Sequence, residues 1–435
     1  MYEHDAPLTF GQLSVWRSLD ALPPPRRVEG NVPRTWPVPA DTTPAQLAAA
    51  WSALVRRHEG LRTRFMPDGS GELRQRVGPA DPDWAPSMVG LASGGPAAVA
   101  NDLAQDPMDL GSGYGWRVGL TERAVDGDRH VVVVVHHIVA DAWSAGQLRA
   151  EFLAALAGDP PTEPGLRPVE LAREQWADAA AGRRRAAVEY VSRCLTGSPS
   201  LTSSAIPADS GRRIQAELIT PAGHRALTAI AGRGGIFAQS ALLALTAIGV
   251  HRVWDGAETK VMLMTGNRTD RRWHRLVTSM NQIVPVPIGR AAEDLSFAEL
   301  AKAMQSASLR AFRYGAYDVD AVAAEGIDLF DLRTMFNYMA PDLPAAPAGA
   351  VARELRRQQP WRHAGPRIDV KIYGSPALKI NIRIDPALLP EDGLDALLDW
   401  YEHELVRVAA DPDQPIGQMS RRCPRLRAVT GTGIR

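Results

Sequence analysis

Residues 131–144 read VVVVVHHIVADAWS, and this stretch decides the fold of the chain. Five consecutive valines predict a strand that is buried on both faces, because β-branched apolar side chains pack well on a pleated sheet. Beyond the valines, Ser144 and Gln147 have the spacing of a capping box, and apolar residues recur at helical intervals as far as Leu156. We therefore expect a helix to begin near Ser144. Two histidines and an aspartate would lie on the turn between strand and helix.

The polar residues on this turn allow several interpretations. Adjacent strand residues face opposite ways, so His136 taken alone would be a hydrogen-bonded core histidine. Asp141 taken alone would cap the helix. A metal site is the weakest interpretation, because no further His or Cys lies nearby to complete a coordination shell, and we expect none. A turn of this kind also holds side chains rigidly at the rim or floor of a cleft, as proton transfer requires.

Length and composition narrow the class of protein. The chain has 435 residues, enough for two lobes, and we place their boundary near residue 175, giving lobes 1–175 and 176–435. Lys+Arg and Asp+Glu both number 49, so no net field favours nucleic acid or an anionic membrane as partner. No segment approaches the ~18 apolar residues of a membrane helix, and the N-terminus lacks the features of a signal peptide. Two separated cysteines agree with a reducing compartment, so we expect a cytoplasmic protein.

Three motifs resemble those of one family. Residues 136–144 resemble the HHxxxDGWS signature of condensation domains of nonribosomal peptide synthetases, with Ala142 where the family has glycine. Residues 57–65, RHEGLRTRF, resemble the family motif RHExLRTxF, and residues 8–16 resemble its first motif. The resemblance extends from about residue 8 to about residue 418. It leaves no adenylation or carrier segment, so we expect a free-standing condensation enzyme of secondary metabolism.

The resemblance implies a fold and a reaction. The fold is α/β, with two chloramphenicol-acetyltransferase-like lobes in a V-shaped pseudo-dimer and a tunnel between them. Carrier proteins would bring a donor thioester, and in some cases the acceptor, on phosphopantetheine arms, so no cofactor would be bound permanently. The enzyme, expected to be a monomer, would join the donor acyl or peptidyl group to an amine or alcohol. The sequence gives neither the donor nor the acceptor.

The resemblance also implies roles for individual residues. His137 would be catalytic and face the tunnel, while His136 faces the first lobe. Asp141 would pair with a buried arginine, Arg268 by position in the matching segment or Arg62 as second choice. These three residues and His136 would support the site. The residues expected to line the tunnel are Ala142, Trp143, Ser144, Asn281 and Asn337.

Ala142 is the departure from the signature. A glycine there would be free to take a positive φ, whereas a Cβ would cost ~1–2 kcal/mol in a left-handed conformation or narrow the tunnel by a methyl group.

Other functions of the same superfamily stay open. One is an acyltransferase that uses soluble acyl-CoA, although the DFGWG motif of plant-type members is absent and single-lobe acetyltransferases are shorter. Another is a non-catalytic recruitment domain, but such domains usually lose one histidine, and both are present here. A third is epimerisation or cyclisation, but cyclisation members replace the first histidine with aspartate, which this chain does not. A serine hydrolase is disfavoured because G-x-S-x-G is absent.

Overall fold

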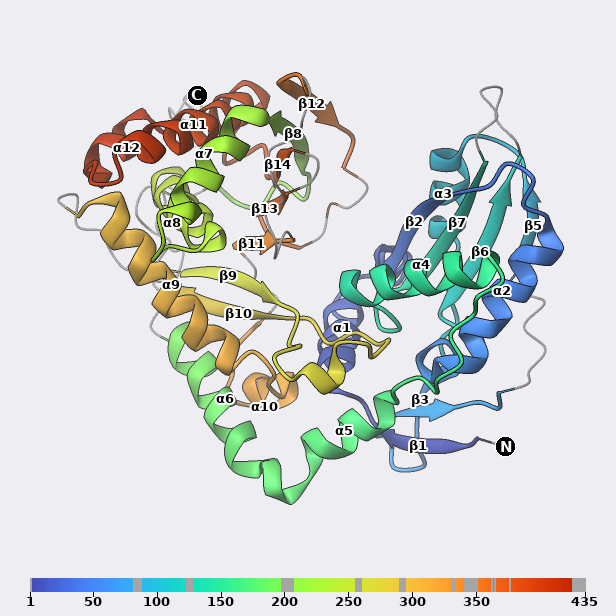
Figure 1. The fold of residues 1–435 in the computed structure, drawn as a ribbon. Helices are drawn as coiled ribbons and strands as arrows, with labels where there is room; N and C mark the ends of the chain where they lie inside the picture. The colour runs from blue at the N-terminus through green and yellow to red at the C-terminus, as the bar shows by residue number, and fades with distance from the viewer. Residues whose placement is uncertain are drawn as a thin grey trace, which may run out of the picture. The chain divides into compact units, whose positions relative to one another are not determined.

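The computed structural model describes residues 2–80, 88–122, 129–196, 207–254, 260–288, 295–329, 333–339, 351–360, 363, 365–374 and 377–424. These residues form two compact units (Figure 1). Unit 1 comprises residues 1–186, 266–282 and 316–319, and unit 2 comprises residues 187–265, 283–315 and 320–435.

Unit 1 combines a three-stranded and a four-stranded sheet with helices. Its elements are β1 (His4–Pro7), α1 (Phe10–Asp20), η1 (Pro24–Gly30), β2 (Asn31–Val38), α2 (Pro44–Arg57), η2 (Glu59–Arg62), β3 (Thr63–Pro67), β4 (Leu73–Val77), β5 (Met88–Ala92), α3 (Pro96–Gln105), β6 (Trp116–Thr121), β7 (Arg129–His136), α4 (Ala142–Leu156), α5 (Pro168–Trp176), η4 (Asp178–Ala180) and η5 (Arg271–Trp273). Helix α6 (Ala181–Leu195) carries the chain into unit 2.

Unit 2 is built on a seven-stranded sheet of order β10-β9-β11-β13-β14-β8-β12. Its elements are β8 (Ile214–Thr220), α7 (Pro221–Gly232), α8 (Ala238–Val253), β9 (Lys260–Thr265), β10 (Gln282–Pro287), α9 (Phe297–Arg313), α10 (Val319–Ala324), β11 (Thr334–Tyr338), β12 (Glu354–Gln358), β13 (Ile368–Tyr373), β14 (Leu378–Ile384), α11 (Glu391–Ala410) and α12 (Ile416–Arg422). Strands β9, β11 and β13 are parallel, and β13, β14, β8 and β12 are antiparallel.

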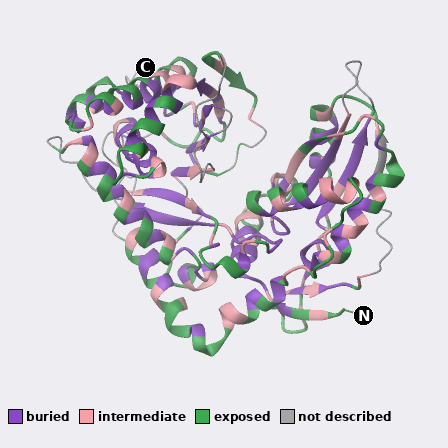
Figure 2. Cartoon of the chain, in the orientation of Figure 1, coloured by how far each residue is buried: buried purple, intermediate pink, exposed green. Residues whose placement is uncertain are grey.

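Strand β7 carries the valine run through the centre of the four-stranded sheet β2-β7-β6-β5. Val132 and Val134 pack against α3 on one face. The other face carries aromatic residues of β2 and β6, whose rings contact Trp51 of α2 and Phe152 of α4. Strands β6 and β7 are buried along most of their length (Figure 2). The predicted strand with two buried faces is confirmed, and its alternation assigns the even-numbered residues to the α3 side.

Several local predictions hold and others need correction. The predicted hairpin of β3 and β4 is present, and so is the antiparallel pair of β13 and β14. Two residues of the turn predicted between β13 and β14, Ser375 and Pro376, lie outside the described residues. Helix α2 begins with the predicted capping box but ends at Arg57, not at Gly60. Most of the predicted connection over residues 196–213 falls outside the described residues.

The start of α4 confirms one of the two capping predictions and corrects the other. Asp141 accepts a hydrogen bond from the backbone N–H of Ser144 at 2.9 Å, and the helix begins at Ala142, near Ser144 as expected. The cap predicted for Asp141 taken alone is confirmed, whereas the capping box expected from Ser144 and Gln147 is wrong. Asp141 and Ser144 are both good capping residues. The tertiary contacts of the Asp141 carboxylate, described below, hold it in the capping position.

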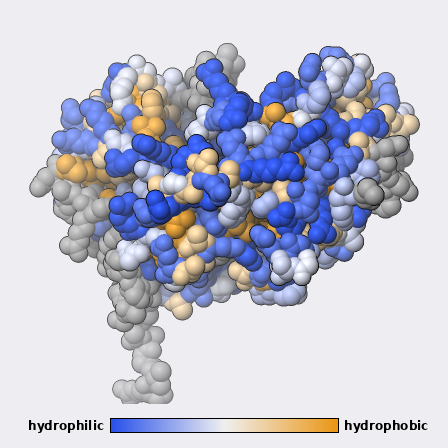
Figure 3. Space-filling model, turned by 90° about the horizontal axis from the view of Figure 1, so that it is seen from below, coloured by the Kyte–Doolittle hydropathy of each residue, from blue (hydrophilic) through white to orange (hydrophobic). Residues whose placement is uncertain are grey.

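The surface has a mixed polarity. On the face drawn in Figure 3, hydrophilic residues cover most of the area and hydrophobic ones lie in scattered groups. None of the helices in the described parts of the chain combines the length and the apolar character needed to cross a bilayer.

Candidate functional site

The two histidines lie where β7 ends. The N–H of His136 donates to the Gly115 carbonyl at 2.8 Å, and the N–H of His137 donates to the Gly30 carbonyl at 2.7 Å. These bonds anchor the end of the strand to its neighbours. The side chain of His136 is buried, whereas that of His137 is half-buried. The two imidazoles therefore have different access to solvent, as the alternation of strand residues predicts.

His136 is held as a neutral imidazole. Its Nδ1 accepts a hydrogen bond from the Ile138 N–H at 3.2 Å, which places the ring proton on Nε2. Burial, together with the neighbouring charge of His137, lowers the pKa of His136 to about 3. The core histidine predicted at this position is thus confirmed as a buried group.

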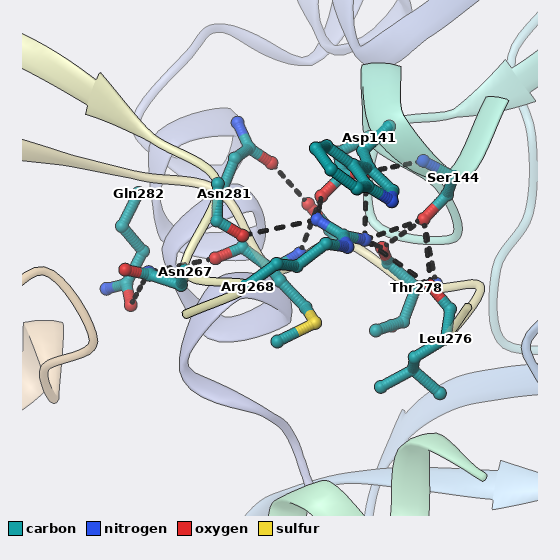
Figure 4. Close-up of polar contacts among 12 residues, drawn as sticks. Asp141, Ser144, Asn267, Arg268, Leu276, Thr278, Asn281 and Gln282 are labelled. Carbon is teal, nitrogen blue, oxygen red and sulfur yellow. Dashed lines mark hydrogen bonds and ion pairs between the residues drawn. The ribbon is translucent and has the colours of Figure 1, made fainter. Parts of the chain in front are cut away.

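Asp141 accepts four hydrogen bonds, which occupy the lone pairs of both carboxylate oxygens (Figure 4). Arg268 donates from Nη1 to Oδ2 at 2.6 Å and from Nη2 to Oδ1 at 3.1 Å. The N–H groups of Ser144 and Met280 donate at 2.9 and 3.1 Å. The ion pair that we expect between Asp141 and Arg268 is present, and the carboxylate is at once a helix cap and a partner of that arginine.

Arg268 extends this network to a distant stretch of unit 1. Its Nη2 also donates to Ser144 Oγ at 2.9 Å, to the Thr278 carbonyl at 3.2 Å and to the Leu276 carbonyl at 3.4 Å. The Trp143 ring lies against the guanidinium, 5.8 Å from its centre to Cζ. The side chains of Arg268 and Asp141 are only 3% and 4% exposed. A buried charge pair with this many hydrogen bonds fixes the turn between β7 and α4.

The backbone just before Arg268 adopts an uncommon conformation. Asn267 has a φ of 50°, in the left-handed region that asparagine tolerates better than most residues. Its Nδ2 donates to the Met280 carbonyl at 2.9 Å, which ties this turn to the same segment that Arg268 contacts (Figure 4).

The motif at residues 57–65 contacts α4 through charged side chains. His58 Nε2 lies 2.6 Å from Oε2 of Glu151 on α4, and Arg57 Nε lies 3.1 Å from the same oxygen. Burial alone would raise the pKa of Glu151, but the hydrogen bond and charge of His58 lower it to about 2. Arg62, the second candidate for pairing with Asp141, pairs instead with Glu3 at 2.5 Å. That alternative is wrong, because the guanidinium of Arg62 lies beside β4 and donates to the Gly78 carbonyl.

Two glycines bring the 276–280 segment close to these elements. A Cβ on Gly60 would lie 2.4 Å from the Val277 carbonyl oxygen, and one on Gly11 would lie 2.4 Å from the Ser279 carbonyl oxygen. Neither glycine has a positive φ. Both are needed for close backbone approach, so Gly60 serves packing rather than the termination of α2.

The residues expected to line a tunnel have different surroundings. Ala142 is exposed as the first residue of α4 and has no positive φ, so the predicted left-handed strain is absent. Trp143 is 46% exposed, and its Nε1 donates to the His274 carbonyl at 2.7 Å. Ser144 is fully buried and donates to the Thr278 carbonyl at 2.8 Å, so we assign its hydroxyl to support of the turn.

The two asparagines belong to different units. Asn281 of unit 1 is half-buried and accepts a hydrogen bond from Ser279 Oγ at 2.8 Å. Asn337 of unit 2 is half-buried on β11, opposite Lys371 of β13. A position on a tunnel wall stays a prediction for both residues.

Several groups around the turn escape sequence reasoning. The Met280 N–H and the carbonyls of Leu276 and Thr278 are backbone groups, which carry no residue-specific signal. The glycine at position 60 is visible in the sequence, but its contact with Val277 depends on a segment far along the chain. Among the described residues, no group of three His, Cys, Asp or Glu side chains has an arrangement that would hold a metal ion.

Solved structures share this fold. The condensation domain of the monacolin K polyketide synthase MokA superposes with a TM-score of 0.78 at 16% identity, covering 95% of this chain and 99% of that one. The first condensation domain of the CDA synthetase gives 0.74 at 19% identity, covering 96% and 98%. The likeness confirms the mixed α/β fold of the chloramphenicol-acetyltransferase-like type.

Sequence relatives lie within much longer proteins. Phosphinothricin tripeptide synthetase PhsC of Streptomyces viridochromogenes is 33% identical over 282 residues, which are 59% of this chain and 25% of that protein. Cyclosporin synthetase simA of Tolypocladium inflatum is 37% identical over 124 residues, which are 26% of this chain and 1% of that protein. The chain thus spans a quarter or less of these relatives. The family model of the condensation domain matches residues 30–421, and the chain belongs to that family.

Proposed function

We propose that this chain transfers an acyl or peptidyl group from the thioester of a carrier-protein phosphopantetheine arm to an amine or alcohol. Membership of the condensation-domain family and similarity to nonribosomal peptide synthetases support this reaction class. The arm would arrive with the carrier protein as part of the substrate. That the whole polypeptide acts on a carrier-bound donor and an amine or alcohol acceptor is part of this proposal.

The observation that carries the proposal is the contrast between the two histidines. His136 is buried and neutral, and its Nδ1 is occupied by a backbone N–H. His137 is half-buried at a turn whose backbone is anchored at 2.7 Å to Gly30. The turn is fixed from the other side by the ion pair of Asp141 and Arg268. His137 is therefore the imidazole that is held rigidly while keeping access to a reactant.

In the proposed reaction, the nucleophile attacks the thioester carbonyl carbon. A carbon–nitrogen or carbon–oxygen bond forms, the carbon–sulfur bond breaks, and the nucleophile's proton passes through His137 to the departing thiolate. An α-amine with a pKa near 8 is partly neutral at pH 7, so His137 would mainly orient it, whereas an alcohol needs a base more. General-base help contributes ~10²–10⁴-fold, while holding the reactants in line contributes ~7–11 kcal/mol.

The test offers the same acyl group on a carrier protein, on coenzyme A and on a pantetheine mimic, each with an amine and with an alcohol acceptor. Products are identified by mass spectrometry. We expect product from the carrier-bound thioester. With the alcohol acceptor, His137→Ala should lower the rate at least about 100-fold, and with the amine acceptor it should lower the rate less. His130→Ala is the matched control, because this half-buried histidine lies near the start of the same strand.

Each other outcome contradicts the proposal. Product from coenzyme A alone would indicate an acyltransferase that uses a soluble donor. No product from any donor would indicate a recruitment domain. Equal rates for the wild type and a folded His137→Ala variant would remove His137 from the chemistry.

A further inference from the structure

Unit 1 contains a cavity of about 340 Å³ that does not include His137. Most of its wall is apolar and comes from α1, η1, β3 and the loop after α3. The apolar side chains include Trp16, Leu19, Val28, Phe65, Met108 and Leu110. This volume and this lining are typical of small-molecule sites, which combine an apolar wall with a few placed polar groups.

One of those polar groups is a buried acceptor without a partner. Asn31 lines the cavity and is only 1% exposed. Its Nδ2 donates to the Ala104 and Asp106 carbonyls, at 2.9 and 3.0 Å. Because both partners are acceptors, these two bonds distinguish the Nδ2 of the side-chain amide from its Oδ1. The remaining Oδ1 is buried and has no hydrogen-bond partner. A buried acceptor in this state is costly and calls for an explanation.

The second polar group stands directly opposite the first. Asn31 of β2 and His136 of β7 are register partners, so their side chains lie on the same face of the sheet. His136 also lines the cavity. Because Nδ1 accepts from Ile138, the hydrogen that this neutral ring can offer is on Nε2. A Cβ on Gly30 would lie 2.5 Å from Leu19 Cδ1 and 2.8 Å from Nε2, so only glycine fits beside this nitrogen.

The charged residues of the wall are already engaged. Arg27 and Asp20 pair with each other at 2.9 Å, and both are about half exposed at the rim. The Asp109 carboxylate accepts hydrogen bonds from the N–H groups of Gly111 and Ser112 in its own loop. Among the side chains that line the cavity, Asn31 therefore has an unpaired acceptor and His136 a ring N–H, while the charges of Asp20, Arg27 and Asp109 have partners of their own.

We propose that this cavity binds an uncharged, mainly apolar molecule that carries one carboxamide group. The amide N–H would donate to Asn31 Oδ1, and the amide carbonyl would accept from His136 Nε2. The two protein groups face one another across one pair of strands, which suits a ligand whose donor and acceptor belong to the same small group. The site goes beyond acyl transfer at His137, and its failure would leave that function untouched.

Isothermal titration calorimetry of the full chain tests the site with four probes that share a six-carbon chain: hexanamide, methyl hexanoate, hexanoate and hexylammonium. Hexanamide should bind one to one. Methyl hexanoate accepts but cannot donate, so Asn31 Oδ1 would stay unpaired, and its affinity should be at least about 10-fold lower. The two charged probes should be weakened at least as much, because burial of an unpaired charge is costly.

A second arm locates the bound probe. Val28→Trp should fill the cavity and weaken hexanamide at least about 10-fold, whereas Leu22→Trp, in the chain just before η1 and outside the lining, should leave its affinity unchanged. In histidine-labelled protein, hexanamide should shift the Nε2 resonance that disappears in His136→Gln. Absence of hexanamide binding, equal affinity for methyl hexanoate, or no shift of that resonance would overturn the proposal. The probe series and the resonance decide the question even if Val28→Trp does not fold.

Discussion

The substitution Asp141→Ala should lower the free energy of unfolding by about 4–6 kcal/mol. Breaking a buried ion pair by removing one partner costs about 3–5 kcal/mol, because the other charge stays buried and unpaired. The Arg268 and Asp141 side chains are 3% and 4% exposed, so solvent cannot screen the charge that remains. The carboxylate also caps α4 through the Ser144 N–H, and loss of an N-cap costs about 1 kcal/mol.

The assay is urea unfolding of the full chain, followed by circular dichroism. Thr43→Ala is the matched control, because Thr43 caps α2 of the same unit and is exposed, and it should cost only about 1 kcal/mol. Its effect also identifies the transition that belongs to unit 1 if the two units unfold separately. Asp141→Ser keeps a capping oxygen but loses the charge, so it should cost about 3–5 kcal/mol.

The reasoning is refuted if Asp141→Ala costs no more than Thr43→Ala. If Asp141→Ala is too unstable to purify, the double variant Asp141→Leu with Arg268→Met decides the matter. It removes both charges, and should therefore be more stable than Asp141→Ala. A double variant that is equally unstable would show that the ion pair is not the cause.

Three further predictions concern stability. His136 has a pKa of about 3 when folded and about 6.5 when unfolded, so the unfolded chain binds more protons between these two pH values. The contribution of His136 to the free energy of unfolding should therefore fall by about 2 kcal/mol from pH 7 to pH 5. Urea unfolding of His136→Gln at both pH values should lack this part of the pH dependence. Gly60→Ala should cost about 1–3 kcal/mol in urea unfolding because its Cβ would meet the Val277 carbonyl at 2.4 Å, and an unchanged midpoint would count against that contact. Ala142→Gly should leave the free energy of unfolding unchanged or lower it by up to about 1 kcal/mol, since Ala142 is already helical; a gain in stability would reveal strain after all.

Much of the fold could be predicted because it follows from local patterns. A run of valines and the alternating isoleucines of β13 and β14 are typical of strands. The capping box at Thr43 is typical of the start of a helix. The pairing of Asp141 with Arg268 could also be anticipated, because a buried carboxylate needs a partner and the family resemblance indicated which arginine supplies it.

The remaining features depend on residues that are distant in the chain. Whether Asp141 or Ser144 caps α4 is decided by Arg268 and the Met280 N–H, not by the local sequence. The need for glycine at position 60 arises from a carbonyl more than two hundred residues later. Asn31 belongs to no motif in the sequence. That its Oδ1 is buried and unpaired follows only from the folded structure, in which β2 pairs with β7.

The central claim, that the imidazole of His137 takes part in acyl transfer, is tested most directly by a single-turnover rate. A preloaded acyl carrier protein is mixed with excess enzyme and amine or alcohol acceptor, and His137→Gln is compared with His130→Gln, the same change near the start of the same strand. We predict a rate at least about 100-fold lower for His137→Gln with the alcohol, a smaller loss with the amine, and no loss for His130→Gln. Equal rates for the two folded variants with both acceptors would contradict the claim.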